Sequence, residues 1–478
     1  MKIVYPKQEI ESQIGFDFVR NYLFEKCVST GGKAWVKQLM PFHDRKAYFT
    51  RLDEVKSFLN LYQISDKPLR INEWVSLPKD LKKSEIEGFT FKLESIVIVR
   101  DFLALAIGVF KTLNWYETKI RPLQKYSSTT EDFSQLLKII DAIVGPNGGV
   151  RPNASPALSK LLSKQERLEQ SLVTVLNKVY KRLQKEQLAH DLAPTVKNGR
   201  YVIPVPSAIR NKVDGVIQGE SGTKNISYVE PLEVIQSNNE LSNVAIEIGY
   251  EIDRLLAAIT FSISGHHKSI SYAETKLHYL DFLNAIQKYS SDFKAVIPVI
   301  SQRNLIKLTN CRHPKLANHL KEIGGKLMPL DFEFSKRNRI MIISGPNAGG
   351  KSVALKTFSL LQYAAQCALP ICADEDNETL LFDNMLTDIG DNQSMDSDLS
   401  TYSAHLSAMK AFLEVGSGNT FIAIDEIGAG TDPQLGGPMA EAMINQFEEK
   451  GFYGIITTHF SNLKAMAQEN NYLFKKLI

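Results

Sequence analysis

The first part of the chain contains long apolar stretches in which polar residues recur at helical spacing. Residues 14–24 and 95–106 show this pattern most clearly. Apolar side chains three and four positions apart fall on one face of a helix, so the pattern predicts a helical bundle. We assign residues 1–150 to a helical core domain and expect Trp35, Trp74 and Trp115 to lie in its core.

A heptad-like rhythm begins near Ser155 and returns in a second run. Two such helices pair along an apolar seam, so we expect an antiparallel coiled-coil lever. Its first arm covers residues 151–190, and its second arm and return to the core cover residues 237–300. The insertion 191–236 holds strand-like segments and glycines, which predict a small β-containing clamp. The first run comprises Leu158, Leu161, Leu168, Leu172, Val175, Val179 and Leu183, and the second comprises Leu241, Val244, Ile248, Ile252, Leu255 and Ile259.

Three short apolar runs mark the last third of the chain, at residues 340–344, 421–424 and 453–458. Continuous apolar runs of this length are typical of parallel strands that are buried on both faces. We therefore predict an α/β domain over residues 301–478, with a helix from Val353 to Gln366. The fold class is a multidomain protein in which α-helical segments precede this α/β domain.

Composition narrows the class of protein. The chain has 478 residues, enough for several domains, and 44% of them are hydrophobic. A net charge of +3 is too small to indicate nucleic-acid binding by itself. The four cysteines lack metal-ligand spacing, which favours free thiols in a reducing cytosol. No signal peptide or apolar run long enough to span a membrane is evident, so we expect a cytoplasmic protein.

A glycine-rich loop follows the first of the three apolar runs. Gly345, four further residues and then Gly350-Lys351-Ser352 have Walker A spacing. Glycines let backbone N–H groups turn toward an anion, Lys351 can reach phosphates, and Ser352 can place its hydroxyl on Mg²⁺. The loop predicts binding of ATP with Mg²⁺ by Gly345, Pro346, Asn347, Ala348, Gly349, Gly350, Lys351 and Ser352.

The other two apolar runs end in residues suited to hydrolysis. Asp425 and Glu426 follow the second run, and His459 follows the third. Since ligands collect at the carboxyl ends of parallel strands, we expect Asp425 to hold Mg²⁺ and Glu426 to orient or deprotonate water. A lone histidine is more often structural, but its position favours a γ-phosphate sensor. Lys351, Glu426 and His459 are thus the candidate catalytic residues.

These motifs, in this order, closely resemble the ATPase domain of the MutS family, which belongs to the ABC class of ATPases. The resemblance extends over 388–394, Leu399 to His405, 425–433 and 457–459. The residues of these motifs are most similar to those of the second bacterial MutS branch. That branch lacks a mismatch-reading N-terminal domain and usually ends in an Smr nuclease domain.

The resemblance implies an ABC-type P-loop ATPase that works as a homodimer with two composite sites. Ser400 would contact the γ-phosphate held by the partner protomer, and Asp432 lies in the loop that would link the two sites. Gln393 would couple nucleotide state to the rest of the chain. Ser400 could equally be a helix N-cap, and the two roles are compatible.

Residues 198–204 also resemble the clamp of this family. Within the clamp, phosphates could be contacted by Lys197, Arg200, Arg210, Lys212 and Lys224. Nearby acids offset these charges, and charge alone leaves nucleic-acid binding open. The first lever arm has an excess of basic residues, although a solvated helix face is the simpler interpretation.

The chain ends 19 residues after His459, whereas the family continues with further strands and dimer-forming helices. We therefore expect a C-terminally truncated member whose ATPase domain is incomplete. It would lack the Smr domain, so nuclease activity is not supported.

Two functions remain open at this point. One is an ATP-dependent clamp that binds mismatched or branched DNA and suppresses recombination. The other is a ribosome-associated ATPase that acts on stalled or collided ribosomes. Either would work in the bacterial cytosol or nucleoid.

Overall fold

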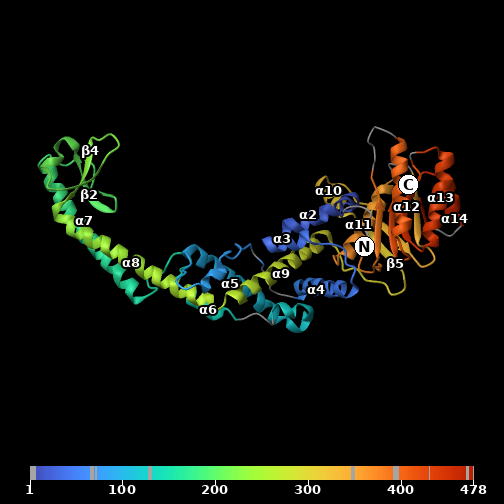
Figure 1. The fold of residues 1–478 in the computed structure, drawn as a ribbon, viewed down its shortest axis with the longest axis horizontal. Helices are drawn as coiled ribbons and strands as arrows, with labels where there is room; N and C mark the ends of the chain where they lie inside the picture. The colour runs from blue at the N-terminus through green and yellow to red at the C-terminus, as the bar shows by residue number, and fades with distance from the viewer. Residues whose placement is uncertain are drawn as a thin grey trace. The chain divides into compact units, whose positions relative to one another are not determined.

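The computed structural model describes residues 7–64, 69, 71, 73–127, 132–345, 350–390, 398–429, 431–469 and 473–476 (Figure 1). Its contacts divide the chain into two compact units. One combines residues 1–74, 108–130 and 273–478, and the other combines residues 75–107 and 131–272. This division by contacts groups the first helices of the chain with the α/β part.

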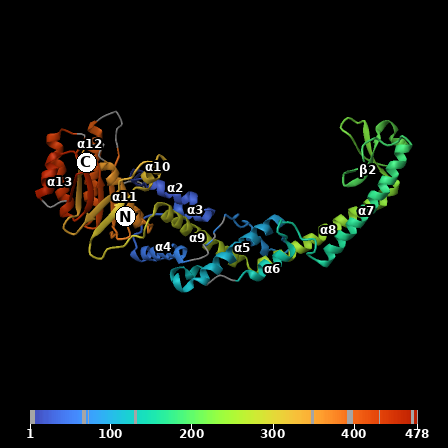
Figure 2. The ribbon, with the colours of Figure 1, turned by 180° about the vertical axis from the view of Figure 1, so that it is seen from behind.

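Two long helices dominate the second unit, α7 (Pro156–Lys185) and α8 (Leu232–Ser264). Ser155 caps α7 by accepting from the Leu158 N–H at 3.0 Å, and it donates to Glu251 at 2.6 Å. At the other end of α7, Arg182 donates to Glu233 at 2.6 Å. The helices therefore run antiparallel and lie side by side, as Figures 1 and 2 show. Their winding as a coiled coil stays a prediction.

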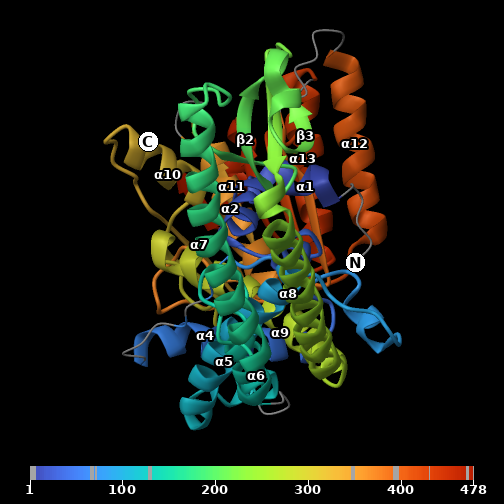
Figure 3. The same cartoon turned by 90° about the vertical axis from the view of Figure 1, so that its left-hand side faces the viewer.

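A four-stranded antiparallel sheet lies between α7 and α8 in the sequence. Its strands are β1 (Thr195–Lys197), β2 (Arg200–Pro206), β3 (Gly215–Glu220) and β4 (Ile226–Pro231), in the order β1-β2-β4-β3. Ile203, Val205 and Val229 of the sheet pack against Leu176 and Leu183 of α7. Figure 3 shows β2 and β3 near the end of this helix. The unit also holds η1 (Leu81–Glu85), α6 (Ser134–Ile143) and part of α5 (Leu93–Trp115).

The helical part of the first unit packs around α9 (His267–Phe293). Asp281 of α9 is fully buried and accepts from the Ser29 N–H at 2.8 Å and the Ser29 hydroxyl at 2.7 Å, which fixes the start of α3. Trp35 packs edge-on against Tyr279. Trp115 is 81% exposed, so its predicted place in the core is wrong. This part comprises α1 (Lys7–Ile14), α2 (Phe16–Lys26), α3 (Thr30–Lys37), α4 (Arg45–Ile64), η2 (Glu117–Lys119) and η3 (Arg121–Tyr126).

A five-stranded parallel sheet forms the centre of the α/β part, in the order β11-β7-β10-β9-β8. Every residue of β7, β9 and β10 is buried, which confirms the three predicted strands. The strands are β7 (Ile340–Ser344), β8 (Asn384–Asp388), β9 (Thr420–Ile424), β10 (Tyr453–Thr458) and β11 (Leu473–Lys476).

Helices cover both faces of this sheet (Figure 1). Apolar side chains of α12 (Asp398–Val415), α13 (Pro433–Glu449) and α14 (Ser461–Glu469) share a core with Ile342, Ile424 and Ile456. Phe358 of α11 (Lys351–Gln366) contacts Phe421 of β9 and Phe334 of β6 (Leu330–Phe334). Strand β6 pairs with β5 (Ile306–Cys311), which is followed by α10 (Pro314–Glu322).

Strand order and register bring three chain segments to one edge of the sheet. β7 adjoins β10, although the next strand along the chain, β8, lies at the far side of the sheet. Ser344 aligns with Thr458, and Ile424 aligns with Ile456. The residues that follow β7, β9 and β10 therefore meet where parallel sheets bind ligands.

The four cysteines are free thiols, as predicted, and the structure shows that all four are buried. None of the helices in the described ranges combines the length and the apolar character that crossing a bilayer needs.

The first helix of the chain is tied to α11, which begins at the glycine-rich loop. Glu11 of α1 is buried and accepts from Arg20 at 2.6 and 2.8 Å and from the Tyr363 hydroxyl of α11 at 2.8 Å. Nearby, Thr387 of β8 donates to Gln13 at 3.0 Å. The N-terminal helix thus braces two elements of the α/β part.

We predict that Glu11→Ala destabilises the protein by about 3 kcal/mol, because it leaves the largely buried Arg20 without its carboxylate. Glu9→Ala, at an exposed position of the same helix, should change stability by less than about 0.5 kcal/mol. Thermal and urea unfolding of both variants measure the difference. Equal effects would show that the Glu11 network does not hold α1 in place.

Candidate functional site

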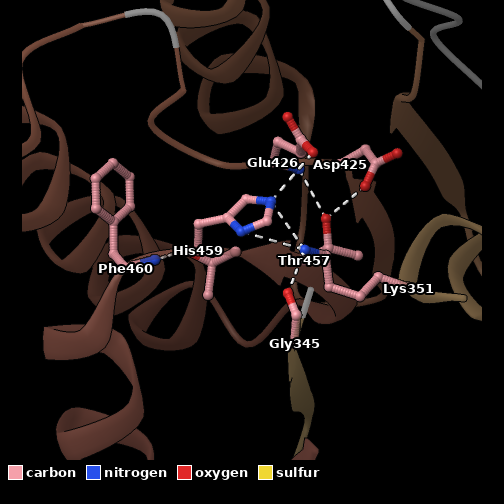
Figure 4. A network of polar contacts seen from close by, with 8 residues as sticks. Gly345, Lys351, Asp425, Glu426, Thr457, His459 and Phe460 are labelled. Atoms are coloured by element: carbon pink, nitrogen blue, oxygen red, sulfur yellow. Dashed lines mark hydrogen bonds and ion pairs between the residues drawn. The ribbon is translucent and has the colours of Figure 1, made fainter. Parts of the chain in front are cut away.

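Lys351 lies at the centre of the candidate site (Figure 4). It is the first residue of α11 and is only 1% exposed. Its Nζ donates to the carbonyl of Gly345 at 2.7 Å and lies 2.8 Å from Nε2 of His459. A buried ammonium group at the N-terminus of a helix suits an anionic ligand, since the helix dipole adds to its charge.

Gly350 and Ser352 flank this lysine. Gly350 precedes α11 in a left-handed conformation, with φ of 81°. A Cβ atom at this position would meet nothing within 4 Å, so glycine is needed for the backbone conformation rather than for space. Ser352 is half-buried in the first turn of α11. Pro346, Asn347, Ala348 and Gly349 lie outside the described residues.

Asp425 and Glu426 follow β9 at the same edge of the sheet. The Thr457 hydroxyl of β10 donates to Asp425 Oδ1 and accepts from the Glu426 N–H at 2.8 Å. Glu426 has a φ of 51°, which is uncommon for a residue with a side chain and is stabilised here by that hydrogen bond. One buried hydroxyl thus orients both acids, a role for Thr457 that the sequence analysis did not assign.

His459 lies between Lys351 and Glu426, as Figure 4 shows. Its Nε2 is 2.8 Å from Lys351 Nζ and 3.3 Å from Glu426 Oε1. One ring nitrogen cannot accept and donate at once, so Nε2 either accepts from Lys351 or, where it carries a proton, donates to Glu426. The imidazole can therefore respond to charge on either side of it.

A second polar pair, which the sequence analysis gave no role, adjoins the acids. Asp388 at the end of β8 lies 2.6 Å from Nδ1 of His405 on α12, and both side chains are largely buried. Its backbone carbonyl also accepts from the Asp425 N–H at 2.9 Å. The hydrogen bond with Asp388 raises the pKa of His405 above its ordinary value, despite the opposing effect of burial. The pair ties α12 to the edge of the sheet where the site lies.

The structure shows fewer contacts for the residues that are expected to act between protomers. Ser400 lies in α12, Gln393 lies outside the described residues, and Asp432 is the N-cap of α13. The Asp432 carboxylate is exposed and accepts from the Gln434 N–H at 2.8 Å. Capping accounts for this aspartate within one protomer, and its link across a dimer stays a prediction.

In the clamp, two of the five predicted nucleic-acid contacts are ion-paired. Arg200 donates to the buried Glu230 at 2.6 Å, and Arg210 donates to Glu220. Lys197 lies over the ring of Tyr228. Lys212 and Lys224 are exposed. Internal pairing reduces the positive charge that the clamp offers to a phosphate chain.

The residues at the sheet edge fit a nucleotide with Mg²⁺. Lys351 and the N-terminus of α11 supply positive charge for phosphates, while the Ser352 hydroxyl and the Asp425 carboxylate supply the oxygen ligands that Mg²⁺ prefers. Glu426 lies beside them with a partly exposed carboxylate. The set combines phosphate binding, metal binding and a base at one place.

Comparison with known proteins is consistent with this site. A family model described as MutS domain V matches residues 341–476. The chain is 30% identical to the protein called Endonuclease MutS2 of Enterococcus faecalis over 96% of its own length and 57% of that protein. For the protein of the same name from Aquifex aeolicus, the values are 28%, 96% and 59%. The Gemmatimonas aurantiaca protein of that name is 32% identical over 73% of this chain and 42% of its own length. The chain thus spans less than two thirds of these relatives.

The Asp388–His405 pair predicts a pH dependence of stability. Because the folded state raises the pKa of His405, its contribution is complete below the unfolded pKa of about 6.5 and is lost as pH rises through the folded value. We expect wild type to lose on the order of 1 kcal/mol more than His405→Gln across that window.

Urea unfolding at a series of pH values measures this contribution. His319→Gln removes an exposed histidine from α10 and should leave the wild-type pH profile unchanged. If His405→Gln followed the wild-type profile as well, Asp388 would not stabilise a charged His405.

Proposed function

This chain belongs to the MutS family and is similar over most of its length to the MutS2 branch, and on that premise we propose that it is an ATPase whose nucleotide state controls binding to DNA. The observation that carries the proposal is that His459 lies within hydrogen-bonding distance of both Lys351 and Glu426. Phosphate binding, the candidate base and the candidate sensor then form one network.

In the proposed mechanism, Lys351 and the start of α11 bind the phosphates of ATP. Ser352 and Asp425 would hold Mg²⁺, which would neutralise charge at the phosphates. Glu426 orients a water for attack on the γ-phosphorus and accepts its proton, while the bond to the β-phosphate oxygen breaks to give ADP and phosphate. Thr457 keeps Asp425 and Glu426 in these separate roles.

His459 would report the state of the nucleotide. Loss of the γ-phosphate changes the charge around Lys351 and Glu426, and the imidazole contacts both residues. The Asp388 carbonyl accepts from the Asp425 N–H, and the Asp388 side chain is paired with His405 of α12. A change at the phosphates could thereby shift α12, the helix that carries Ser400.

We further propose a homodimer in which Ser400 and Asp432 of each protomer complete the site of the other. ATP binding would close the dimer and hydrolysis would reopen it. The lever and clamp of two protomers would then enclose mismatched or branched DNA, in keeping with a role in suppressing recombination. The excess of basic over acidic residues on α7 favours nucleic acid as the ligand.

Two substitutions at the site should separate binding from turnover. Lys351→Ala is expected to weaken ATP binding at least tenfold, because it removes the buried ammonium group. Glu426→Gln should bind ATP normally but turn it over about 100-fold more slowly, since a general base contributes roughly that much or more. Binding of a fluorescent ATP analogue and release of phosphate measure the two effects.

Lys356→Ala, on the same helix five residues further along, serves as the control and should alter neither measurement greatly. Normal ATP binding by Lys351→Ala would show that the glycine-rich loop is not the nucleotide site.

Mixing two inactive variants tests the composite site. Lys351→Ala and Ser400→Ala should each lack turnover, but a mixed dimer contains one site with an intact lysine and an intact serine. Random mixing in equal amounts should recover about a quarter of wild-type activity. If the mixture stays inactive while both variants still dimerise, Ser400 does not act across the dimer.

A further inference from the structure

One face of α7 carries only basic or hydroxyl side chains, all of them exposed. They recur at alternating steps of four and three residues, which places them in a line along the helix. We call this set the cationic face of α7. It comprises Lys160, Lys164, Arg167, Ser171, Thr174, Lys178, Lys181 and Lys185.

The cationic face points away from α8. The residues of α7 that are buried are Leu158, Leu172, Leu176, Val179 and Leu183. Each of them is followed two positions later by a member of the cationic face, and two residues turn a helix by about 200°. The six cations therefore lie opposite the apolar seam, on the solvent side of the helix.

Acidic residues are kept apart from this face. Glu166 and Glu169, the acids of α7, lie neither three nor four positions from any of its cations, so they do not form the usual helix pairs. Glu169 instead accepts from the Tyr201 hydroxyl. Across the described residues, no contact joins a cation of this face to a carboxylate.

Two contrasts show that this charge is unusual within the unit. Arg182 of α7 lies outside the cationic face and is paired with Glu233 of α8, and Arg200 and Arg210 of the clamp are likewise paired. α7 has seven basic and two acidic residues, whereas α8 has five acidic and one basic residue. An anionic partner is thus attracted to α7 and repelled by α8.

The dimensions and chemistry of the face match a nucleic-acid backbone. From Lys160 to Lys185 the helix rises about 37 Å, and duplex DNA presents one phosphate charge per roughly 1.7 Å over such a length. Five of the six cations are lysines, which act as point charges on phosphates and read no base sequence. Ser171 adds a hydroxyl group suited to a phosphate oxygen in the middle of the line, whereas the Thr174 hydroxyl donates to the Gln170 carbonyl at 2.8 Å.

We propose that the cationic face of α7 binds the phosphate backbone of duplex DNA independently of sequence. This inference rests on the proposed function and makes it more specific, since it moves the main backbone contact from the clamp to the lever helix.

The experiment compares three proteins for binding to a fluorescent 30-base-pair duplex by anisotropy, over a series of salt concentrations. The test variant combines Lys164→Gln, Lys178→Gln and Lys181→Gln. The matched control combines Lys321→Gln, Lys326→Gln and Lys336→Gln, three exposed lysines of the α/β part. Circular dichroism and ATP turnover without DNA should be unchanged in both.

For the test variant we expect at least tenfold weaker binding at low salt, and a slope of log affinity against log salt that is smaller by about 2 to 3. The control should behave as wild type. A further variant with arginine at the same three positions should restore the slope, because it keeps the charge.

The possible outcomes distinguish failure of the α7 contact from failure of the proposed function. If wild type binds the duplex and the test variant matches it in slope, the contact on α7 is wrong and the proposed function stands. If wild type does not bind the duplex, the contact on α7 is wrong, and the proposed function fails as well only if the protein does not bind a four-way DNA junction either. If the test variant bound duplex RNA more weakly than wild type but bound duplex DNA equally well, the assignment of DNA as the ligand would be overturned.

Discussion

The candidate site depends on one buried charge at the carboxyl edge of a parallel sheet. Lys351 Nζ has lost nearly all contact with water and is held by a backbone carbonyl and an imidazole. Burial of an ammonium group costs several kcal/mol, which an anionic ligand would offset. Register then places Asp425, Glu426 and His459 beside it, because β7, β9 and β10 end together. Burial of the Lys351 charge lowers the stability of the unliganded protein, and the same burial strengthens the attraction of Lys351 for a phosphate.

Much of this edge could be predicted from the sequence. Strands β7, β9 and β10 follow from continuous apolar runs, and α11 begins within two residues of its expected start. The pairing of Thr457 with both acids could not be predicted, since it depends on which strands are neighbours, and the pairing of Asp388 with His405 could not because it depends on how α12 packs against β8. Trp115 shows a related limit, because a large apolar side chain alone does not determine burial.

The surface that attracts phosphates in the lever and clamp also could not be predicted from the sequence alone. From the basic residues in the sequence, the candidate nucleic-acid contacts were assigned to the clamp. In the structure, Arg200 and Arg210 of the clamp are paired with acids. The basic excess of the first arm was visible in the sequence, but its meaning depends on which face α8 covers. Once the apolar seam is located, the lysines of α7 fall on the opposite side, and helix geometry separates them from the acids. Neutralisation by neighbours, rather than the number of basic residues, decides which surface attracts phosphates.

The central claim is that ATP binding at Lys351 commits the protein to DNA. The most direct measurement is a competition at physiological salt between a four-way DNA junction and ribosomes, using Glu426→Gln protein held in its ATP-bound state. The account predicts that the protein occupies the junction, and that it does so more tightly with ATP than without nucleotide. Preference for ribosomes, or the same junction affinity with and without ATP, would contradict it.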